Sequence, residues 1–157
     1  MRRSSLCSGE PGKKSLVILP VVFSCFIFCL ASCSRQPVYQ QPLVEGTEVV
    51  IDAGTLGHEK PVFFTFPYHG RKINFFVFRT GEKVLSFLDA CASCYSSKLG
   101  YHSENGSVIC RKCDLRYSLS NIEQGFGNCF PIPLEGYLKG REYRIPVSRL
   151  QEAADKF

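Results

Sequence analysis

Hydrophobic runs between residues 48 and 90 predict a series of short β-strands. The runs cover 48–51, 62–66, 73–78 and 83–88, and they are rich in β-branched and aromatic residues. His69-Gly70 and Thr80-Gly81 interrupt the pattern in the way that hairpin turns do. We therefore expect residues 60–90 to form an antiparallel meander that supplies one side of a hydrophobic core.

The pattern changes after residue 90, where shorter runs are separated by Gly, Asn and Ser. Runs at 107–110 and 143–147 predict two more strands. The segment from Ser148 to Lys156 has the composition of a brief helix, which a serine can begin. The second half of the chain therefore predicts small β-elements followed by a short C-terminal helix.

The first 33 residues have the pattern of an export signal of the lipoprotein type. Four basic side chains and one acidic side chain precede an uncharged hydrophobic run at 16–31, which is long for a signal and short for a spanning helix. Leu30-Ala31-Ser32-Cys33 ends this run and resembles a bacterial lipobox, in which the cysteine sulfur receives a diacylglycerol. We expect residues 1–32 to be removed and Cys33 to be lipidated, with an uncleaved signal anchor as the alternative.

The rest of the chain divides into a tether and one folded domain. Residues 33–45 are polar and interrupted by prolines, as suits a lipid-anchored tether, and 46–157 is the length of a single domain. The net charge of the whole chain is +5, but more than half of that excess lies in the predicted signal. The balanced remainder, with no arginine-rich stripe, argues against nucleic-acid binding. We expect the domain in the cell envelope, outside the cytoplasm, held to a membrane by two acyl chains.

Two Cys-x-x-Cys pairs carry the clearest chemistry of the chain. Cys91 and Cys94 form the first, and Cys110 and Cys113 follow after fifteen residues. Two residues between thiols allow a tight turn, here called a knuckle, to point both sulfurs at one metal with its backbone N–H groups turned toward them. Two knuckles then complete a tetrahedral site with bonds of about 2.3 Å. Thiolates in this arrangement suit zinc, iron or an iron–sulfur cluster.

Other uses of these pairs are weaker alternatives. Disulfides form in an oxidising compartment, and a Cys-x-x-Cys pair can be a redox-active dithiol. A dithiol of the thioredoxin kind, however, opens a helix in a βαβ unit, which neither pair does. The chain has no Cys-x-x-Cys-His, which argues against covalent c-type haem. The pattern therefore predicts a mainly β fold (β-rich α+β): a small antiparallel meander, a two-knuckle Cys-x-x-Cys metal ribbon and a short C-terminal helix.

Cys129 is a fifth thiol, set in a turn rich in glycine and proline. A cysteine left over in an exported domain indicates a reactive thiol, an alternative ligand or a further cluster contact, whereas a buried structural cysteine is the simpler interpretation. His102, between the two pairs, is the best placed of the histidines as a nitrogen ligand. A surface position is the more economical interpretation for it, because four thiolates already complete a tetrahedral site. The other two are His58 and His69.

Four motifs follow one another in the order of a known family. They are Asp89-Ala90-Cys91-Ala92-Ser93-Cys94, Gly100-Tyr101, Ile109-Cys110-Arg111-Lys112-Cys113 and Cys129-Phe130-Pro131-Ile132-Pro133. Across residues 48–147 the chain thereby resembles the membrane iron–sulfur protein family called FtrD-like. The resemblance implies an extracytoplasmic metal-binding domain that transfers electrons and is associated with iron or other metal transport.

Three functions are compatible with these residues. In the first, Cys91, Cys94, Cys110 and Cys113 hold an iron–sulfur cluster and pass single electrons to a membrane partner in metal transport. In the second, the same thiols form a structural zinc ribbon that holds an interaction module together. In the third, the protein delivers a metal for which Cys129 competes. Hydrolase motifs and phosphate-binding loops do not occur in the sequence, so we do not expect a turnover enzyme.

Overall fold

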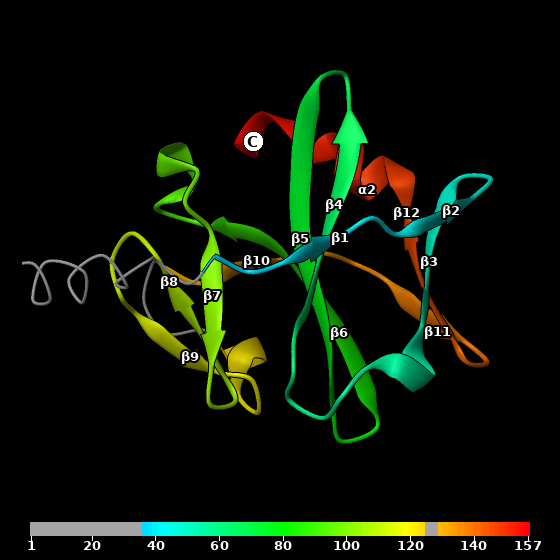
Figure 1. Ribbon diagram of the computed structural model, residues 1–157, viewed down its shortest axis with the longest axis horizontal. Coiled ribbons are helices and arrows are strands. Elements are labelled where there is room, and N and C mark those ends of the chain that lie inside the picture. The colour runs from blue at the N-terminus through cyan, green and yellow to red at the C-terminus, as the bar shows by residue number, and fades with distance from the viewer. Residues whose placement is uncertain (1–35, 125–128) are drawn as a thin grey trace, which may run out of the picture. The chain divides into compact units, whose positions relative to one another are not determined.

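The computed structural model describes residues 36–124 and 129–157. The predicted signal and the predicted lipidation site, Cys33, lie outside the described residues. Within them the fold is mainly β, with a short α-helix near the C-terminus, as the sequence predicts (Figure 1). The strands form three sheets of five, four and three strands.

The largest sheet contains the predicted meander. Its strand order is β1-β4-β5-β6-β10, and β4, β5 and β6 are antiparallel neighbours. The hairpin turn between β4 and β5 is formed by His69 and Gly70, which both have positive φ as this tight turn requires. The meander prediction is confirmed. The strand bounds are Tyr39–Gln40 (β1), Val62–Tyr68 (β4), Arg71–Thr80 (β5), Lys83–Cys91 (β6) and Pro131–Pro133 (β10).

The three-stranded sheet follows the meander in the chain, whereas the four-stranded sheet combines two strands from before the meander with two from near the C-terminus. The four-stranded sheet has the order β11-β12-β3-β2, and the three-stranded sheet has the order β7-β8-β9. Helix α2 (Val147–Glu152) follows β12 directly, close to where the sequence predicts a helix. The bounds are Leu43–Glu45 (β2), Glu48–Asp52 (β3), Tyr101–Glu104 (β7), Ser107–Cys110 (β8), Arg116–Ser118 (β9), Tyr137–Lys139 (β11) and Glu142–Pro146 (β12). Short 3-10 turns cover Ala53–Thr55, Tyr95–Ser97, Ile122–Gln124 and Ala154–Lys156.

The segment predicted as a tether is partly folded onto the domain. β1 pairs with β4 in parallel, and β2 pairs with β3 in antiparallel fashion. The domain boundary predicted at residue 46 is therefore too late. Pro37 and Pro42 interrupt the segment without preventing this, because short strands at sheet edges tolerate neighbouring prolines.

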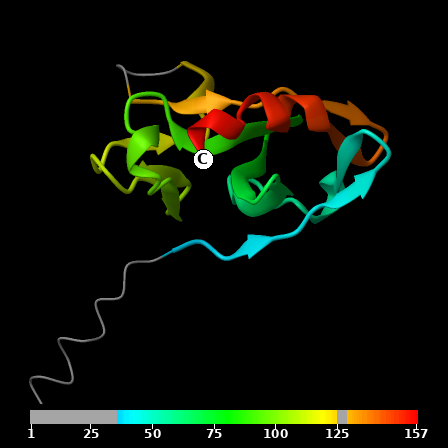
Figure 2. The same ribbon diagram turned by 90° about the horizontal axis from the view of Figure 1, so that it is seen from above.

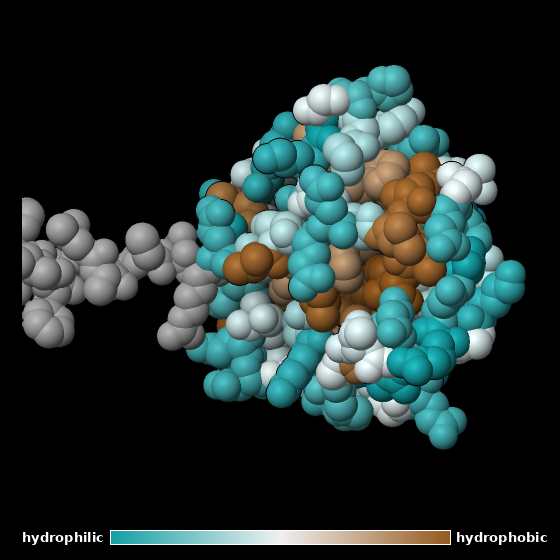
Figure 3. Space-filling view, turned by 45° about the vertical axis from the view of Figure 1, so that its right-hand side comes forward, coloured by the Kyte–Doolittle hydropathy of each residue, from teal (hydrophilic) through white to brown (hydrophobic). Residues whose placement is uncertain are grey.

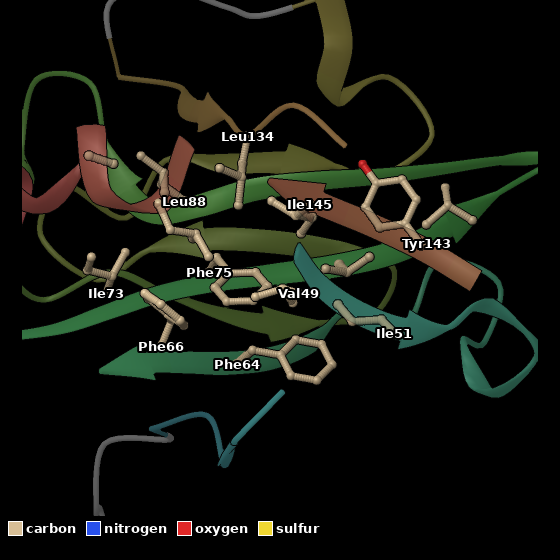
Figure 4. Close-up of a cluster of buried hydrophobic side chains, with 14 of the residues drawn as sticks. Val49, Ile51, Phe64, Phe66, Ile73, Phe75, Leu88, Leu134, Tyr143 and Ile145 are labelled. Atoms are coloured by element: carbon tan, nitrogen blue, oxygen red, sulfur yellow. The ribbon is translucent and has the colours of Figure 1, made fainter. Parts of the chain in front are cut away.

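One face of the five-stranded sheet contributes to a cluster that we call the sulfur-free core. It lies between this sheet, the four-stranded sheet and the C-terminal helices, and Figure 4 shows its side chains converging. Phe75, Ile73 and Ile145 are completely buried in it. Its other members are Val49, Ile51, Ala53, Leu56, Phe64, Phe66, Val77, Val84, Leu88, Ala90, Leu134, Tyr143, Leu150 and Ala153.

The opposite face of the same sheet contributes to a second cluster, the sulfur-containing core. Phe76 and Phe78 of β5 belong to it, whereas Phe75 and Val77, which alternate with them along the strand, belong to the first core. The reason is that successive side chains of a strand point to opposite faces of the sheet. The meander thus supplies two cores, where the sequence predicts a single side of one. The full set is Phe63, Phe76, Phe78, Phe87, Cys91, Tyr101, Val108, Cys110, Tyr117, Leu119, Ile122 and Cys129.

Hydrophobic side chains are exposed on one face of the domain. The face in Figure 3 carries a hydrophobic band among hydrophilic residues. In the perpendicular view of Figure 2, β1 and helix α2 lie on opposite sides of the domain. Among residues 36–124 and 129–157, no helix combines the length and hydrophobicity needed to span a bilayer.

Candidate metal centre

The first knuckle begins where β6 ends. Cys91 is the last residue of this strand and is buried, and the turn that follows brings Cys94 back toward it, with the Cys94 N–H donating to the Cys91 carbonyl over 3.2 Å. The backbone N–H groups of Ser93 and Cys94 donate to the Cys91 sulfur. Burial acts to raise the pKa of Cys91. The hydrogen bond from Cys129, these two backbone bonds and the interaction with the Tyr101 side chain outweigh burial, so the pKa is lowered. The predicted knuckle geometry is present.

The second knuckle repeats this arrangement at the end of β8. Cys110 is the last residue of that strand, and its sulfur accepts from the N–H groups of Lys112 and Cys113. Asp114 follows with φ of 57°, which turns the chain back toward β9. Burial dominates at Cys110 and raises its pKa to about 12. In each knuckle the first cysteine is buried, and in the second knuckle Cys113 is exposed.

The fifth thiol reaches the same place from β10. The Cys129 sulfur lies 2.7 Å from that of Cys91, 2.9 Å from that of Cys113 and 3.4 Å from that of Cys94. The backbone holds it there, because β10 pairs with β6 and the Ala92 N–H donates to the Phe130 carbonyl over 3.0 Å. Cys129 is therefore part of the cysteine centre, by which we mean the five thiols together.

The four sulfurs that lie closest to one another are not the four that the sequence favours. The sulfur atoms of Cys91, Cys94, Cys110 and Cys129 all lie within 4.8 Å of one another. Cys113 is outside this group, although it interacts with Cys94, Cys110 and Cys129. All five cysteines of the described residues are free thiols. Burial and the neighbouring thiols raise the pKa of Cys129, so its sulfur is protonated unless a metal displaces the proton.

The donor set fits a soft metal ion. Thiolates suit zinc, iron and iron–sulfur clusters. Tetrahedral bonds of about 2.3 Å place ligand sulfurs about 3.8 Å apart, which is compatible with the 4.8 Å limit of this group. The cluster of buried thiols thus points to a metal or iron–sulfur cofactor, as the sequence predicts.

The three histidines take other positions. His58 accepts a hydrogen bond from the Gly81 N–H over 3.2 Å, and His69 packs edge-on against the Tyr68 ring at 4.3 Å. His102 is half-buried on β7, opposite Ile109 of β8. None of them belongs to the group of potential metal ligands found among the described residues.

Polar side chains around the centre were not recognised as a group from the sequence. Asp89 is buried two residues before Cys91, where it accepts hydrogen bonds from the Tyr39 hydroxyl at 2.5 Å and from the Tyr101 N–H at 2.7 Å. Burial raises its pKa to about 6. The Tyr117 hydroxyl donates to the Cys129 carbonyl. These tyrosines have the spacing of ordinary strand residues, so no sequence signal distinguishes them from core aromatics.

The comparisons with known proteins give a family and a distant structural likeness. The ferredoxin of carbazole 1,9a-dioxygenase from Nocardioides aromaticivorans IC177 aligns with 68% of this chain and 98% of its own chain, at a TM-score of 0.40 and 17% identity. No curated protein matches the chain. The profile described as membrane iron-sulfur containing protein FtrD-like matches residues 56–157, which is more than half of the chain. The chain therefore belongs to the FtrD-like family of membrane iron–sulfur containing proteins.

Proposed function

We propose that this protein is a lipid-anchored, extracytoplasmic electron carrier whose cysteine centre holds an iron–sulfur cofactor and serves iron or other metal transport. The observation that carries the proposal is the convergence of five thiols, with two pairs of backbone N–H groups directed at the Cys91 and Cys110 sulfurs. Such N–H···S bonds favour the thiolate form and tune the potential of iron–thiolate centres. When bound, an iron–sulfur centre accepts and releases single electrons.

We assign the ligands as Cys91, Cys94, Cys110 and Cys129. The basis is the mutual proximity of these four sulfurs. Cys113, the fourth ligand predicted from the sequence, is exposed and contacts Cys129, so it forms the solvent-facing edge of the centre. A membrane-bound redox or metal-transport partner can approach at this edge.

Serine variants test the ligand assignment. Cys129→Ser removes a ligand, so we expect it to lose most of its bound metal, whereas Cys113→Ser retains most of it. Metal content per chain after gel filtration is the measurement. The opposite result, loss in Cys113→Ser and retention in Cys129→Ser, would restore the four paired cysteines as the ligand set.

A second candidate function is a structural ribbon around one zinc ion. The specific observation in its favour is the compactness of the four sulfurs, which matches the span of a single tetrahedral ion. In this case the metal stabilises the fold and no electron moves.

Anaerobic purification of the full chain distinguishes the two functions. Metal analysis and the visible absorption spectrum are recorded before any reconstitution. We expect iron together with visible absorption that dithionite bleaches. A colourless protein with one zinc ion per chain would establish the structural ribbon in its place, and a protein without metal would contradict both.

The membrane attachment has its own test. We expect cells that produce the wild-type chain to incorporate labelled palmitate into it, because lipidation of the predicted site adds acyl chains. Cys33→Ala should abolish the label and release the protein from the membrane fraction. Labelling that persists in Cys33→Ala would contradict the lipoprotein proposal.

A further inference from the structure

Tyr101 has a buried hydroxyl group without a hydrogen bond of normal geometry. The side chain is completely buried in the sulfur-containing core. Among the described residues, its hydroxyl oxygen is the one buried side-chain polar atom without such a bond, although it lies close enough to Cys91 for the two side chains to interact. An unsatisfied buried hydroxyl is costly, and such groups in folded proteins usually face a ligand, an ion or water. We therefore expect the hydroxyl to form its hydrogen bond when a ligand or ion binds to the folded chain.

The surroundings of Tyr101 fix its ring in one orientation. Its N–H donates to the Asp89 carboxylate over 2.7 Å, and its Cα lies opposite that of Cys110 in the β7–β8 pair. Its ring packs edge-on against Phe76 at 6.1 Å and against Tyr117 at 6.5 Å. Because both the backbone and the ring are held, the hydroxyl has little freedom to turn toward another partner.

Three cysteines of the cysteine centre lie in the same buried cluster as the Tyr101 side chain. They are Cys91, Cys110 and Cys129, and the Tyr101 hydroxyl interacts with the Cys91 side chain. Their sulfurs are three of the four in the mutually close group. The Tyr101 hydroxyl therefore faces the cysteine centre.

The other two buried tyrosines of the domain differ in this respect. The Tyr117 hydroxyl donates to the Cys129 carbonyl. The Tyr143 hydroxyl lies 2.9 Å from the hydroxyl oxygen of Ser86. Both hydroxyls are satisfied by the chain itself, so the lack of a normal hydrogen bond at Tyr101 is specific to its position.

We propose that Tyr101 is a positioning residue of the metal centre, whose O–H donates a hydrogen bond to the Cys91 sulfur when that sulfur is a metal-bound thiolate. This inference rests on the proposed function. Without metal, the Cys91 sulfur is engaged with that of Cys129 at 2.7 Å. Metal binding draws both sulfurs onto the ion and leaves negative charge on Cys91, which the hydroxyl can then stabilise. Donors of this kind hold the ligand in place and, in iron centres, raise the reduction potential.

The test compares Tyr101→Phe with Tyr143→Phe in the metal-loaded full chain. Each variant removes one hydroxyl from a buried tyrosine, but only the first removes a donor that faces the cysteine centre. Metal retention is measured against a competing chelator, and the midpoint potential is measured where the metal is iron. We expect Tyr101→Phe to release metal at roughly tenfold lower chelator concentration and to have a more negative potential. Tyr143→Phe should match the wild type in both.

Denaturant unfolding of the metal-free variants separates a role of Tyr101 in fold stability from a role in positioning the metal ligand. Tyr101→Phe loses only the contact with the Cys91 thiol there, so its stability should stay close to that of the wild type, whereas Tyr143→Phe should be less stable because it loses the hydrogen bond with Ser86. Wild-type metal retention and potential in Tyr101→Phe would overturn the inference and leave the proposed function intact. A wild-type chain that binds no metal would instead overturn the proposed function, and the inference with it.

Discussion

The two cores differ although they share the same central strands. The sulfur-free core is closed by aliphatic and aromatic side chains, and its buried hydroxyl, that of Tyr143, is paired with Ser86. The sulfur-containing core also includes aromatic side chains of the meander, but it contains thiols and the buried hydroxyl of Tyr101, which lacks a hydrogen bond of normal geometry. What differs is the layer that packs against each face of the sheet.

The comparison teaches that the two halves are stabilised by different means. The four-stranded sheet and helix α2 supply Ile145 and Leu150, both completely buried, to the sulfur-free core. The three-stranded sheet consists of strands of three or four residues, and small sheets of this size depend on additional packing or on a metal. We therefore expect hydrophobic burial to stabilise the sulfur-free core, whereas the sulfur-containing core should need bound metal to stay folded.

Metal removal should have the largest effect and should act on one core. Structural zinc–thiolate sites in small domains contribute about 10–16 kcal/mol to folding, so a chelator under reducing conditions should expose the three-stranded sheet. Hydrogen exchange is the measurement. We expect the amides of β7–β9 to lose protection while those of β3 and β12 keep most of theirs. Equal loss in all three sheets would show that the cores are not separable.

A cavity in the sulfur-free core should give the reverse pattern. Ile145→Ala removes a completely buried side chain from β12, and we expect it to lower the free energy of unfolding by about 2–5 kcal/mol. Metal content should stay at the wild-type value because the thiols are on the other face of the sheet. Ile145→Val, expected to cost about 1 kcal/mol, is the graded control. Metal loss from the folded Ala variant would contradict this independence.

The glycine before Tyr101 should link stability and metal retention. Gly100 has φ of 66°, and a Cβ at this position would clash with the Asp89 carboxylate. Gly140 has a similar φ of 64° but nothing within 4 Å of its Cβ position. We expect Gly140→Ala to cost about 1 kcal/mol in the free energy of unfolding, from backbone strain alone.

Gly100→Ala should cost more than this control, because the clash adds to the strain, and it should weaken metal retention, because Asp89 holds the backbone of Tyr101. Denaturant unfolding and chelator competition on both variants are the measurements. Equal behaviour of the two alanine variants would show that the contact with Asp89 has no consequence for the cysteine centre.

Acid should have a smaller effect, on the side of the sulfur-free core. Hydrogen bonds from Tyr137 and Arg144 lower the pKa of Glu48. A lowered pKa means that the carboxylate contributes stability above the usual pKa of glutamate, and that this contribution is lost as the pH falls through the lowered value. Unfolding at stepwise lower pH should therefore show a decline that is weaker in Glu48→Gln. Parallel pH profiles for the two proteins would contradict this role of Glu48.

Much of the fold follows from local signals, and much of the site does not. Runs of β-branched and aromatic residues and the glycine turns predict the meander, because strand pairing across tight turns depends on residues close together in the sequence. β1 and β2 could not be predicted, since an edge strand of two or three residues depends on the strand beside it. The two knuckles also follow from the spacing of the cysteines. The place of Cys129 depends on the pairing of β10 with β6, which no local pattern encodes.

The Tyr39–Asp89 hydrogen bond has a mechanical consequence. Tyr39 lies on β1, which runs parallel to β4, and its hydroxyl binds the carboxylate two residues before Cys91. A force on the chain ahead of β1 would act on the β1–β4 backbone bonds and on this side-chain bond. A pull on the preceding chain would therefore reach the cysteine centre through the hydrogen bond between Tyr39 and Asp89.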